Sequence, residues 1–505
     1  MFIVSHVAAE DIAQGPRLPA RAAALARGEG VLVALVVLGG VLRFATLSSQ
    51  SFDLDESVTV ALLHHGFSGM LSTIPETEST PPLYYVLAWI WTKLFGLNEA
   101  GLRSLSALAG TAMIPLVYLS TTRLISRNAA LIAAALTAAS PWLIWYSQEA
   151  RAYSLFALLS LASFATFMVA IDTPTKRVLA SWAILSALAV ASHYFAVFLV
   201  VPEALWLVAQ KEARRRACAA VAFVGVVGLA LMPLALEQAH GIKGKAGFLQ
   251  TPLSSRITAI PTRFLLGEAA PPSSKAGLVA LALILVVAGG LFLLQGGPSA
   301  HPRPLWIGLS VAAFAVLFPI LMALAGNDYL DARNLVGVWA PLIIILAAGY
   351  AAMDRIGLLT AAALVGLFLA LVVIGDTDTA VQRTDYRGAA SALGVSPGRG
   401  ERAIVVSPDF NWTPLAYYLP NYPQLGSGNV GVREIDLIGW DTQALSRETQ
   451  RTLNHYGFRL TGTRKLQKLK VVRFAAPAPV AVSRAELLRS HLGDGSATVL
   501  IQASD

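Results

Sequence analysis

Three carboxylates, Asp53, Asp55 and Glu56, lie within four positions of each other in the stretch SFDLDESVTVALLHHG, residues 51–66. An apolar block precedes this stretch directly, so the carboxylates stand at the edge of a predicted membrane span. Ionisable residues are costly there and are default candidates for function. Asp53 followed three positions later by Glu56 also fits a capping box, the pattern that begins a helix. For these two residues the structural and the functional interpretation both stay open, whereas Asp55 is left without an obvious structural task.

Other ionisable residues are predicted to lie on the same face of the membrane. They are Glu76, Glu78, Glu149, Arg151, His193, Asp328, Asp331 and Arg333, with Arg43 and Arg103 at the ends of flanking spans and Tyr146 and Tyr153 beside Glu149. Acidic and basic groups gathered on one face indicate an external site that handles a polar, anionic substrate.

Several of these residues also have a plainer interpretation. Glu149 and Arg151 could pair with each other at a turn, where exposed ion pairs contribute little. His193 is more often a packed interfacial histidine than a ligand. Arg333 could extend to lipid phosphates or hold a substrate phosphate through two hydrogen bonds. Arg103 heads a span, and we expect its side chain to extend to the membrane surface.

The elements that position these residues are predicted to be membrane-spanning helices. Of the 505 residues, 55% are hydrophobic and 13% are charged, against about 25% charged in soluble proteins. The apolar residues form blocks of a length that crosses a bilayer core of about 30 Å. Eleven spans are predicted, near residues 31–47, 104–122, 128–145, 153–171, 178–194, 195–210, 217–236, 276–295, 305–325, 334–352 and 357–374. The single cysteine, Cys218, excludes an intramolecular disulfide.

Lysine and arginine in the loops orient the spans. Residues 1–30 are predicted to be a cytoplasmic tail, and positive charge also marks the loops 121–128, 175–177, 211–216, 301–304 and 353–355 as inside. These loops account for much of the net charge of +8, which therefore does not call for nucleic acid as a partner. Alternation then places outside the loops 48–103, 146–153, 237–274 and 326–333 and the residues after 375. We expect the apolar segment 81–96 to be a helix along the outer surface, because a crossing there would invert every later loop.

The chain after residue 375 changes in composition and is predicted to be a small α/β domain, residues 376–505. Strands are expected at 402–408, 432–439, 469–474 and 497–502, and helices at 413–419, 441–457 and 483–493. Alternation of this kind is typical of a layered α/β domain. Residues 31–375 form the transmembrane domain in this scheme. The sequence has no glycine-rich phosphate loop and no histidine or cysteine cluster with metal-ligand spacing.

Taken in order, several of these pieces resemble the GT-C superfamily of lipid-linked-sugar glycosyltransferases. The resemblance is to the protein O-mannosyltransferase and aminoarabinose-transferase group, family 39-like, and covers most of residues 31–420. It rests on Asp55-Glu56 after the first span, STPPLYYVLAWIWTKLFGLNEAGLRSLSAL (79–108), WYSQEARAYSL (145–155), YLDARNLVGVWAP (329–341), and TDYRGAASAL followed by IVVSPDF and LAYYL.

The resemblance implies a GT-C fold in a cell (inner or plasma) membrane and a polyprenyl-phosphate sugar as donor, with the active site and the C-terminal domain extracytoplasmic. Mannose or another pentose or hexose would move to an acceptor hydroxyl with inversion. Asp55 is implied as general base with Glu56 beside it as catalytic, and Arg333, Arg151 and Arg263 as ligands of the donor phosphate. Further substrate contacts are implied for Asp53, Glu78, Tyr84, Glu149, Tyr153, His193 and Tyr329.

One departure concerns the position before the first proline, where relatives often carry an acidic residue or Asp-His. This sequence has Ser79-Thr80 there, and the nearest carboxylate is Glu78. A divalent cation therefore stays open as a cofactor, and the acceptor, whether protein, lipid or glycan, stays open as well.

Three other functions compete with a transferase. A transporter or flippase of lipid-linked saccharides would place its charges at the midplane and show inverted repeats. A non-catalytic, membrane-anchored binding protein would not need eleven spans. An O-antigen-type ligase or polymerase would not share the early order of Asp55-Glu56 and PPLYY.

Overall fold

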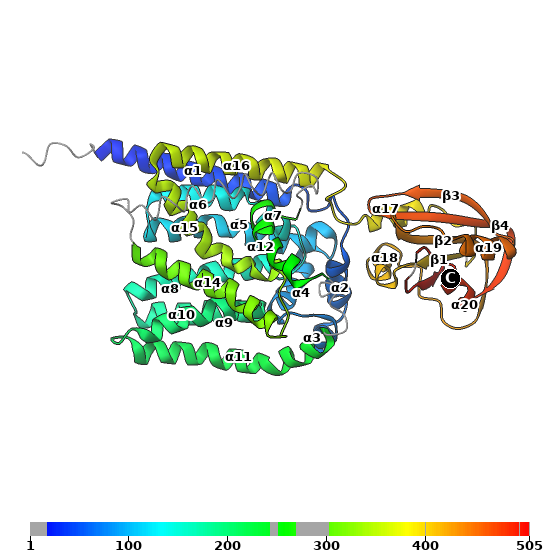
Figure 1. The fold of residues 1–505 in the computed structure, drawn as a ribbon, viewed down its shortest axis with the longest axis horizontal. Helices are drawn as coiled ribbons and strands as arrows, with labels where there is room; N and C mark the ends of the chain where they lie inside the picture. The colour runs from blue at the N-terminus through cyan, green and yellow to red at the C-terminus, as the bar shows by residue number, and fades with distance from the viewer. Residues whose placement is uncertain (1–17, 243–250, 269–301, 399, 494, 504–505) are drawn as a thin grey trace, which may run out of the picture.

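The structure, a computed structural model, describes residues 18–242, 251–268, 302–398, 400–493 and 495–503. It consists of a bundle of helices with a smaller α/β domain beyond one end (Figure 1). We call this the site end of the bundle. The predicted span 276–295 and the first part of the predicted cytoplasmic tail lie outside the described residues. The predicted class, a mainly helical multi-span membrane protein with a small C-terminal α/β sheet, is confirmed.

Among the described residues, six helical stretches are long and apolar enough to cross a membrane. They are α5 (Glu99–Leu124), α8 (Tyr153–Asp172), Arg214–His240 within α11 (Arg214–Ile242), Arg303–Leu324 within α14 (Pro302–Leu324), Ala332–Ala352, made of η3 (Ala332–Val338) and α15 (Trp339–Ala352), and α16 (Asp354–Thr377). A helix lies at each of the ten predicted spans on described residues, but α9 (Lys176–Ser192) and α10 (Val197–Ala209) are shorter than these six.

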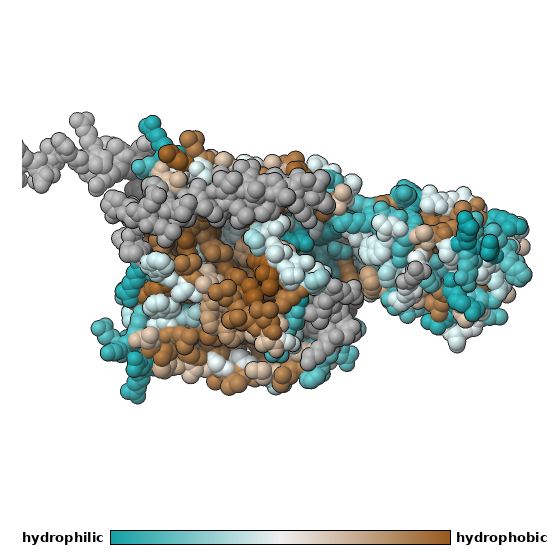
Figure 2. All heavy atoms as spheres, viewed as in Figure 1, coloured by the Kyte–Doolittle hydropathy of each residue, from teal (hydrophilic) through white to brown (hydrophobic). Residues whose placement is uncertain are grey.

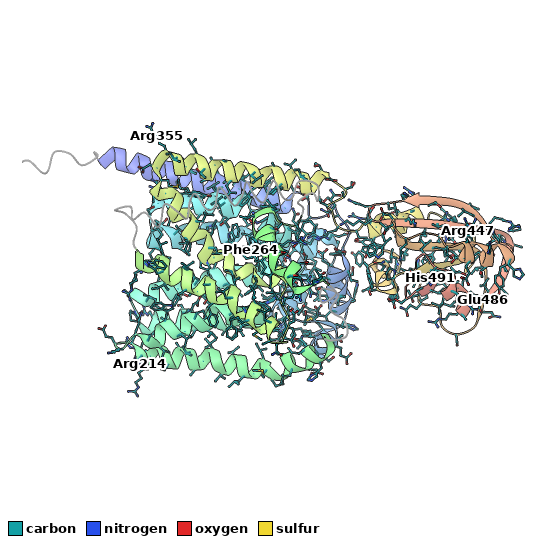
Figure 3. All side chains as sticks on the ribbon, in the orientation of Figure 1. Arg214, Phe264, Arg355, Arg447, Glu486 and His491 are labelled. Atoms are coloured by element: carbon teal, nitrogen blue, oxygen red, sulfur yellow. The ribbon has the colours of Figure 1, made fainter. Side chains whose placement is uncertain are left out.

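The surface of the bundle has the character of a protein in lipid. Figure 2 shows apolar side chains over the visible face of the bundle, and hydrophilic ones over the C-terminal domain. Large apolar side chains of the bundle that are exposed include Leu205, Leu321 and Trp306. Arg214 and Arg355, from two of the loops predicted to be inside, both lie at the end of the bundle opposite the C-terminal domain, on opposite sides of it (Figure 3).

The predicted span 128–145 is broken in the structure. Helices α6 (Arg127–Ala139) and α7 (Pro141–Ser147) meet at an angle of 54°. Pro141 has no N–H, so the Thr137 carbonyl four residues earlier loses its helical partner. Arg43, which ends the neighbouring helix α1 (Leu18–Phe44), donates to the Thr137 oxygen at 2.9 Å and to the Ala138 oxygen at 3.0 Å. The buried Arg43 thus satisfies carbonyl groups that the bend exposes.

Three shorter helices form the site end of the bundle. They are α2 (Leu54–Leu63), α3 (Phe67–Thr77) and α4 (Leu83–Phe95), and they share a core with Phe52, Tyr84 and Tyr85. Helix α4 falls on the apolar segment 81–96. Its 13 residues reach only about 20 Å at 1.5 Å per residue, which is too short for a bilayer core.

The C-terminal domain is built on a five-stranded sheet with the order β3-β4-β2-β1-β5. The strands are β1 (Arg402–Val406), β2 (Asn429–Trp440), β3 (Arg459–Lys465), β4 (Leu469–Ser483) and β5 (Thr498–Ile501). The pair β1–β2 is parallel, and the other pairs are antiparallel.

Four of these strands match the predicted ones, and β3 was not predicted. Helices α18 (Trp412–Tyr418), α19 (Arg447–His455) and α20 (Arg484–Arg489) lie within the predicted helical segments or overlap them closely. Helices α17 (Tyr386–Ala392) and α18 lie nearest the bundle (Figure 1). The residues that contact the bundle come from this side of the domain.

Candidate active site

The carboxylate cluster begins helix α2 as the sequence predicts. Asp53 is the N-cap, and its side chain accepts a hydrogen bond from the Leu54 N–H at 2.9 Å. Glu56 accepts in return from the Asp53 N–H at 3.1 Å, which completes the capping box. The structural interpretation of these two residues is therefore confirmed. It fixes the start of α2, and with it the position from which Asp55 projects.

Glu56 is also the partner of a buried arginine. Its Oε1 accepts from Arg103 Nε at 2.7 Å and from the Ala150 N–H at 2.9 Å, while Oε2 accepts from Arg103 Nη2 at 2.6 Å. Both side chains are buried. Burial raises the pKa of Glu56, but the charge and hydrogen bonds of Arg103 bring it below its usual value. The expectation that Arg103 extends to the membrane surface is wrong, because its side chain is buried and paired with Glu56, 47 residues earlier in the sequence.

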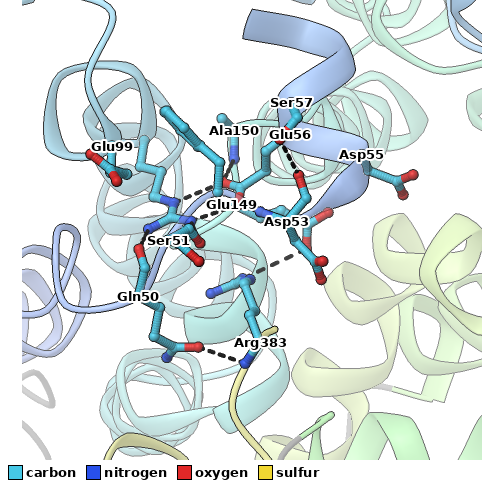
Figure 4. Close-up of polar contacts among 12 residues, drawn as sticks. Gln50, Ser51, Asp53, Asp55, Glu56, Ser57, Glu99, Glu149, Ala150 and Arg383 are labelled. Atoms are coloured by element: carbon cyan, nitrogen blue, oxygen red, sulfur yellow. Dashed lines mark hydrogen bonds and ion pairs between the residues drawn. The ribbon is translucent and has the colours of Figure 1, made fainter. Parts of the chain in front are cut away.

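Asp55 points away from Glu56 and Glu149, as Figure 4 shows, and pairs with Arg333. Asp55 Oδ2 lies 2.7 Å from Arg333 Nη1, and both side chains stay accessible, with 43% of Asp55 and 34% of Arg333 exposed. Arg333 Nε is 3.4 Å from Asp331 Oδ2, and the guanidinium lies 6.0 Å from the ring centre of Tyr153.

The carboxyl group of Asp55 is held in its ionised form. Its partial burial raises the pKa, but the charges of Arg333 and Arg151, with the hydrogen bond from Arg333, bring it below its usual value. At neutral pH Asp55 is therefore a carboxylate that can accept a proton or a hydrogen bond.

Arg151 pairs with Glu78 behind this site. Its Nη1 donates to Glu78 Oε2 at 2.7 Å, to Thr59 Oγ1 at 3.0 Å and to the Asp55 carbonyl oxygen at 3.3 Å. Tyr85 donates to the same Glu78 oxygen at 2.6 Å, while Glu78 Oε1 is buried without a hydrogen-bond partner in the described part of the chain. Burial raises the pKa of Glu78 despite the opposing charge of Arg151.

Glu149 lies against Arg383, which enters from the chain after α16. Glu149 Oε2 is 3.7 Å from Arg383 Nη2, and the Arg383 guanidinium lies 4.2 Å from the ring centre of Trp145. Burial raises the pKa of Glu149 to about 7, Arg383 opposes this, and the neighbouring Glu56 and Asp55 charges add to it. The alternative in which Glu149 pairs with Arg151 is wrong, since each has a different partner.

The remaining predicted residues lie near the site but are engaged differently. Tyr84 is buried in the core of the site end, 3.5 Å from Ser106 Oγ. His193 is buried as well, accepts from the Phe195 N–H at 3.2 Å and stacks on Phe156 with 4.7 Å between ring centres. The interpretation of His193 as a packed histidine is confirmed. Tyr329 is half-buried.

Arg263 belongs to α12 (Leu253–Leu266) and is paired with Glu268. Glu268 also accepts from the Tyr146 hydroxyl at 3.1 Å, and the Tyr146 ring lies 4.8 Å from that of Tyr153. A chain of contacts therefore joins Arg263 to the residues beneath Arg333. A metal site is not evident: the described residues contain no group of three or more His, Cys, Asp or Glu side chains arranged to hold an ion.

Two residues of the site were missed at the level of sequence. Arg383 follows the last span in polar sequence, and Glu268 stands in a loop, so neither shows a local signal. A search for oppositely charged residues in predicted outer loops that are far apart in the sequence could have found these two residues.

Comparison with known proteins bears on these observations. Residues 79–236 match the family model of dolichyl-phosphate-mannose-protein mannosyltransferases. This match covers less than a third of the chain and agrees with the resemblance seen in the sequence. The matched segment contains Glu149, Arg151 and Tyr153 but neither Asp55 nor Arg333. No curated protein sequence matches the chain.

Among solved structures, the chain resembles ArnT from Cupriavidus metallidurans bound to undecaprenyl phosphate. The TM-score is 0.55 at 13% identity, over 88% of this chain and 98% of that one, which shows a shared fold. An oligosaccharyltransferase from Archaeoglobus fulgidus in complex with zinc and sulfate gives a TM-score of 0.45 at 15% identity, over 76% and 61%. Archaeal oligosaccharyltransferase AglB from the same organism, with an inhibitory peptide and a dolichol-phosphate, gives 0.44 at 13%, over 77% and 63%.

Proposed function

We propose that this chain transfers a sugar from a polyprenyl-phosphate donor to an acceptor hydroxyl on the outer face of the membrane, with Asp55 as general base. The observation that carries the proposal is the contrast in exposure among the carboxylates. Asp55 pairs with an arginine and keeps 43% of its side chain exposed, whereas Glu56, Glu78 and Glu149 are buried. Of these four carboxylates, Asp55 is the one that an acceptor hydroxyl can reach directly.

Arg333 is the proposed ligand of the donor phosphate. It is the second residue of the candidate span Ala332–Ala352, which supports our proposal that its guanidinium lies at the level of the lipid phosphates. Its side chain is one-third exposed, and a planar guanidinium matches a phosphate through paired hydrogen bonds.

The other two predicted phosphate ligands are assigned supporting parts. Arg151 is buried against Glu78 and reaches the Asp55 carbonyl oxygen, so we assign it to holding the start of α2 and adding positive charge behind the site. Arg263 is paired with Glu268 and is connected to Tyr153, beside Arg333, through Glu268 and Tyr146, so we place it outside the phosphate site. Arg333 is therefore the ligand on which donor binding is expected to depend most.

The proposed step is a direct displacement. Asp55 takes the proton of the acceptor hydroxyl while the hydroxyl oxygen bonds to the anomeric carbon of the sugar. The bond from that carbon to the phosphate oxygen breaks, and its electron pair leaves with the phosphate, which Arg333 neutralises. One such displacement inverts the anomeric centre. Because the phosphate leaves as an anion held by a cation, no acid is required to protonate it.

The outer location and the sugar are part of the proposal. Arg214 and Arg355 lie at the end of the bundle opposite the C-terminal domain (Figure 3), and positively charged loops favour the cytoplasm. The site end would then be extracytoplasmic. The description of the matched family names dolichyl-phosphate-mannose, and we propose mannose or another pentose or hexose as the sugar.

The test is a transfer assay on membranes that contain the protein, supplied with a panel of radiolabelled polyprenyl-phosphate sugars. With the sugar that wild type transfers, Asp55→Asn should lower the rate by roughly a hundredfold or more, the usual contribution of a general base. Glu76→Gln, an exposed carboxylate on α3 in the same loop, is the matched control and should stay active. A fully active Asp55→Asn would refute the assignment, and label that only crosses the bilayer would indicate a flippase.

A further inference from the structure

The segment that leads into the carboxylate cluster, residues 48–52, is held by the C-terminal domain. The Gln50 side-chain oxygen accepts from the Arg383 N–H at 2.8 Å. Ser51 Oγ donates to the Thr384 carbonyl oxygen at 2.8 Å and accepts from the Tyr386 N–H at 3.1 Å. Arg383 and Thr384, between α16 and α17, and Tyr386, the first residue of α17, thus bind two neighbouring residues of this segment.

Two further side chains of the domain bind the ends of the same segment. Arg387 donates to the Ser48 carbonyl oxygen at 2.9 Å. The Tyr418 hydroxyl of α18 accepts from the Phe52 N–H at 2.8 Å and donates to Glu99 Oε1 at 2.7 Å. Phe52 stands directly before the N-cap residue Asp53. The domain therefore holds the residue that immediately precedes the N-cap of α2.

The bundle holds this segment from the other side. Arg103, the buried partner of Glu56, donates to the carbonyl oxygens of Leu47 at 2.7 Å, Gln50 at 2.8 Å and Ser51 at 2.9 Å. The segment consequently lies between one arginine of the bundle and a row of donors and acceptors from the C-terminal domain. Its backbone has little freedom to move independently of that domain.

Arg383 connects this contact to the second carboxylate of the site. Its side chain is buried, donates to the Trp145 carbonyl oxygen at 3.2 Å and lies 3.7 Å from Glu149 Oε2. Its own backbone N–H holds Gln50, as Figure 4 shows. A single residue of the C-terminal domain therefore contacts both the segment before α2 and the turn that carries Glu149.

From these contacts we infer that the C-terminal domain positions the catalytic carboxylate, with Tyr418 and Arg383 as positioning residues that act through Phe52 and Glu149. The inference rests on the proposed function, because it assumes that Asp55 performs the chemistry. Asp55 lies three residues beyond Phe52, so a shift of this segment moves its carboxylate relative to the bound donor. Arg333 belongs to η3 of the bundle, so we expect it to keep its place when this segment shifts. Loss of the contacts should therefore impair the chemical step while donor binding is retained.

The experiment measures kcat and the donor KM for Tyr418→Phe and Arg383→Gln in the full-length protein, with thermal unfolding to establish how much is folded. We expect kcat to fall by roughly ten- to a hundredfold, as a small misplacement of a reacting group can cause, with the donor KM within about twofold of wild type. Arg383→Lys retains the charge near Glu149 and should recover part of kcat. Two changes in the same domain serve as matched controls and should behave as wild type. They are Arg447→Gln, at the start of α19, and Tyr456→Phe, at its C-cap.

Wild-type kcat in both variants, or a fall in activity that only follows the amount of folded protein, would overturn the inference. The two proposals fail separately. If Asp55→Asn abolishes transfer while Tyr418→Phe and Arg383→Gln leave kcat unchanged, only the positioning inference is lost. If Asp55→Asn is fully active, the proposed base is lost, whatever the positioning variants do.

Discussion

Glu149 should make the folded protein less stable as the pH rises through neutrality. Burial raises its pKa to about 7 from an ordinary value of 4.5, against the opposing charge of Arg383. Between these two values the folded state holds a proton that the unfolded state has released. The stability that this proton provides is complete below about pH 4.5 and is lost as the pH rises to about 7. Each unit between the two pKa values corresponds to about 1.4 kcal/mol, so the loss amounts to about 3 kcal/mol.

Glu149→Gln removes this dependence because the amide cannot ionise. In a chain of this length about 3 kcal/mol corresponds to about 3 °C in the unfolding midpoint. The midpoints of variant and wild type should therefore lie close together at pH 5, and the variant should be higher by about that amount at pH 8. Thermal unfolding of the purified protein in detergent across this range measures the difference, with exposed Glu76→Gln as control. If the unfolding midpoints of variant and wild type change in parallel with pH, or if the variant is less stable at pH 8, the contact with Arg383 outweighs the effect of burial on the pKa of Glu149.

Three other substitutions test the arginines and carboxylates of the site separately. Arg333→Gln should raise the donor KM by roughly ten- to a hundredfold, because hydrogen bonds to charged groups contribute about 1.5–3 kcal/mol. Arg263→Gln should change it by less than about threefold, because we assign the donor phosphate to Arg333 and not to Arg263. Equal effects of the two changes would contradict that assignment. Glu56→Ala leaves the charge of Arg103 buried and unpaired, so stability should fall by about 3–5 kcal/mol. A normally folded Glu56→Ala protein, by unfolding midpoint and yield, would contradict this account of the pair.

Features of the site that depend on neighbouring residues could be predicted from the sequence. The capping box of Asp53 and Glu56 is a pattern of four residues, and the structure contains it. The apolar blocks predicted helices for the same reason, because hydropathy is a local property. The bend between α6 and α7 was not predicted, although Pro141 marks it. The carbonyl groups that the bend frees are bound by the buried Arg43, which is distant in the sequence.

Partners that are distant in the chain could not be predicted in this way. Arg103 was expected at the membrane surface, yet it is buried against Glu56, 47 residues earlier. Arg333 meets Asp55 across 278 residues. Charge pairs of this kind leave no periodic signal. Strand β3 escaped for a related reason: all its residues are exposed, so no alternation of apolar side chains marks it.

Among the described residues, the carboxylate–arginine pairs of Asp55, Glu56, Glu78 and Glu149 differ in the free energy needed to separate them. Removing one member of a buried pair typically costs about 3–5 kcal/mol, which applies to the pairs of Glu56 and Glu78 because both carboxylates are fully enclosed. Exposed pairs are worth about 0–1 kcal/mol, and the pair of Asp55 with Arg333 is the one with substantial exposure on both members. A donor phosphate that binds Arg333 can therefore separate this pair at small cost and leave the others intact. It follows that donor binding would release Asp55 for the acceptor hydroxyl at the moment when the leaving group is in place.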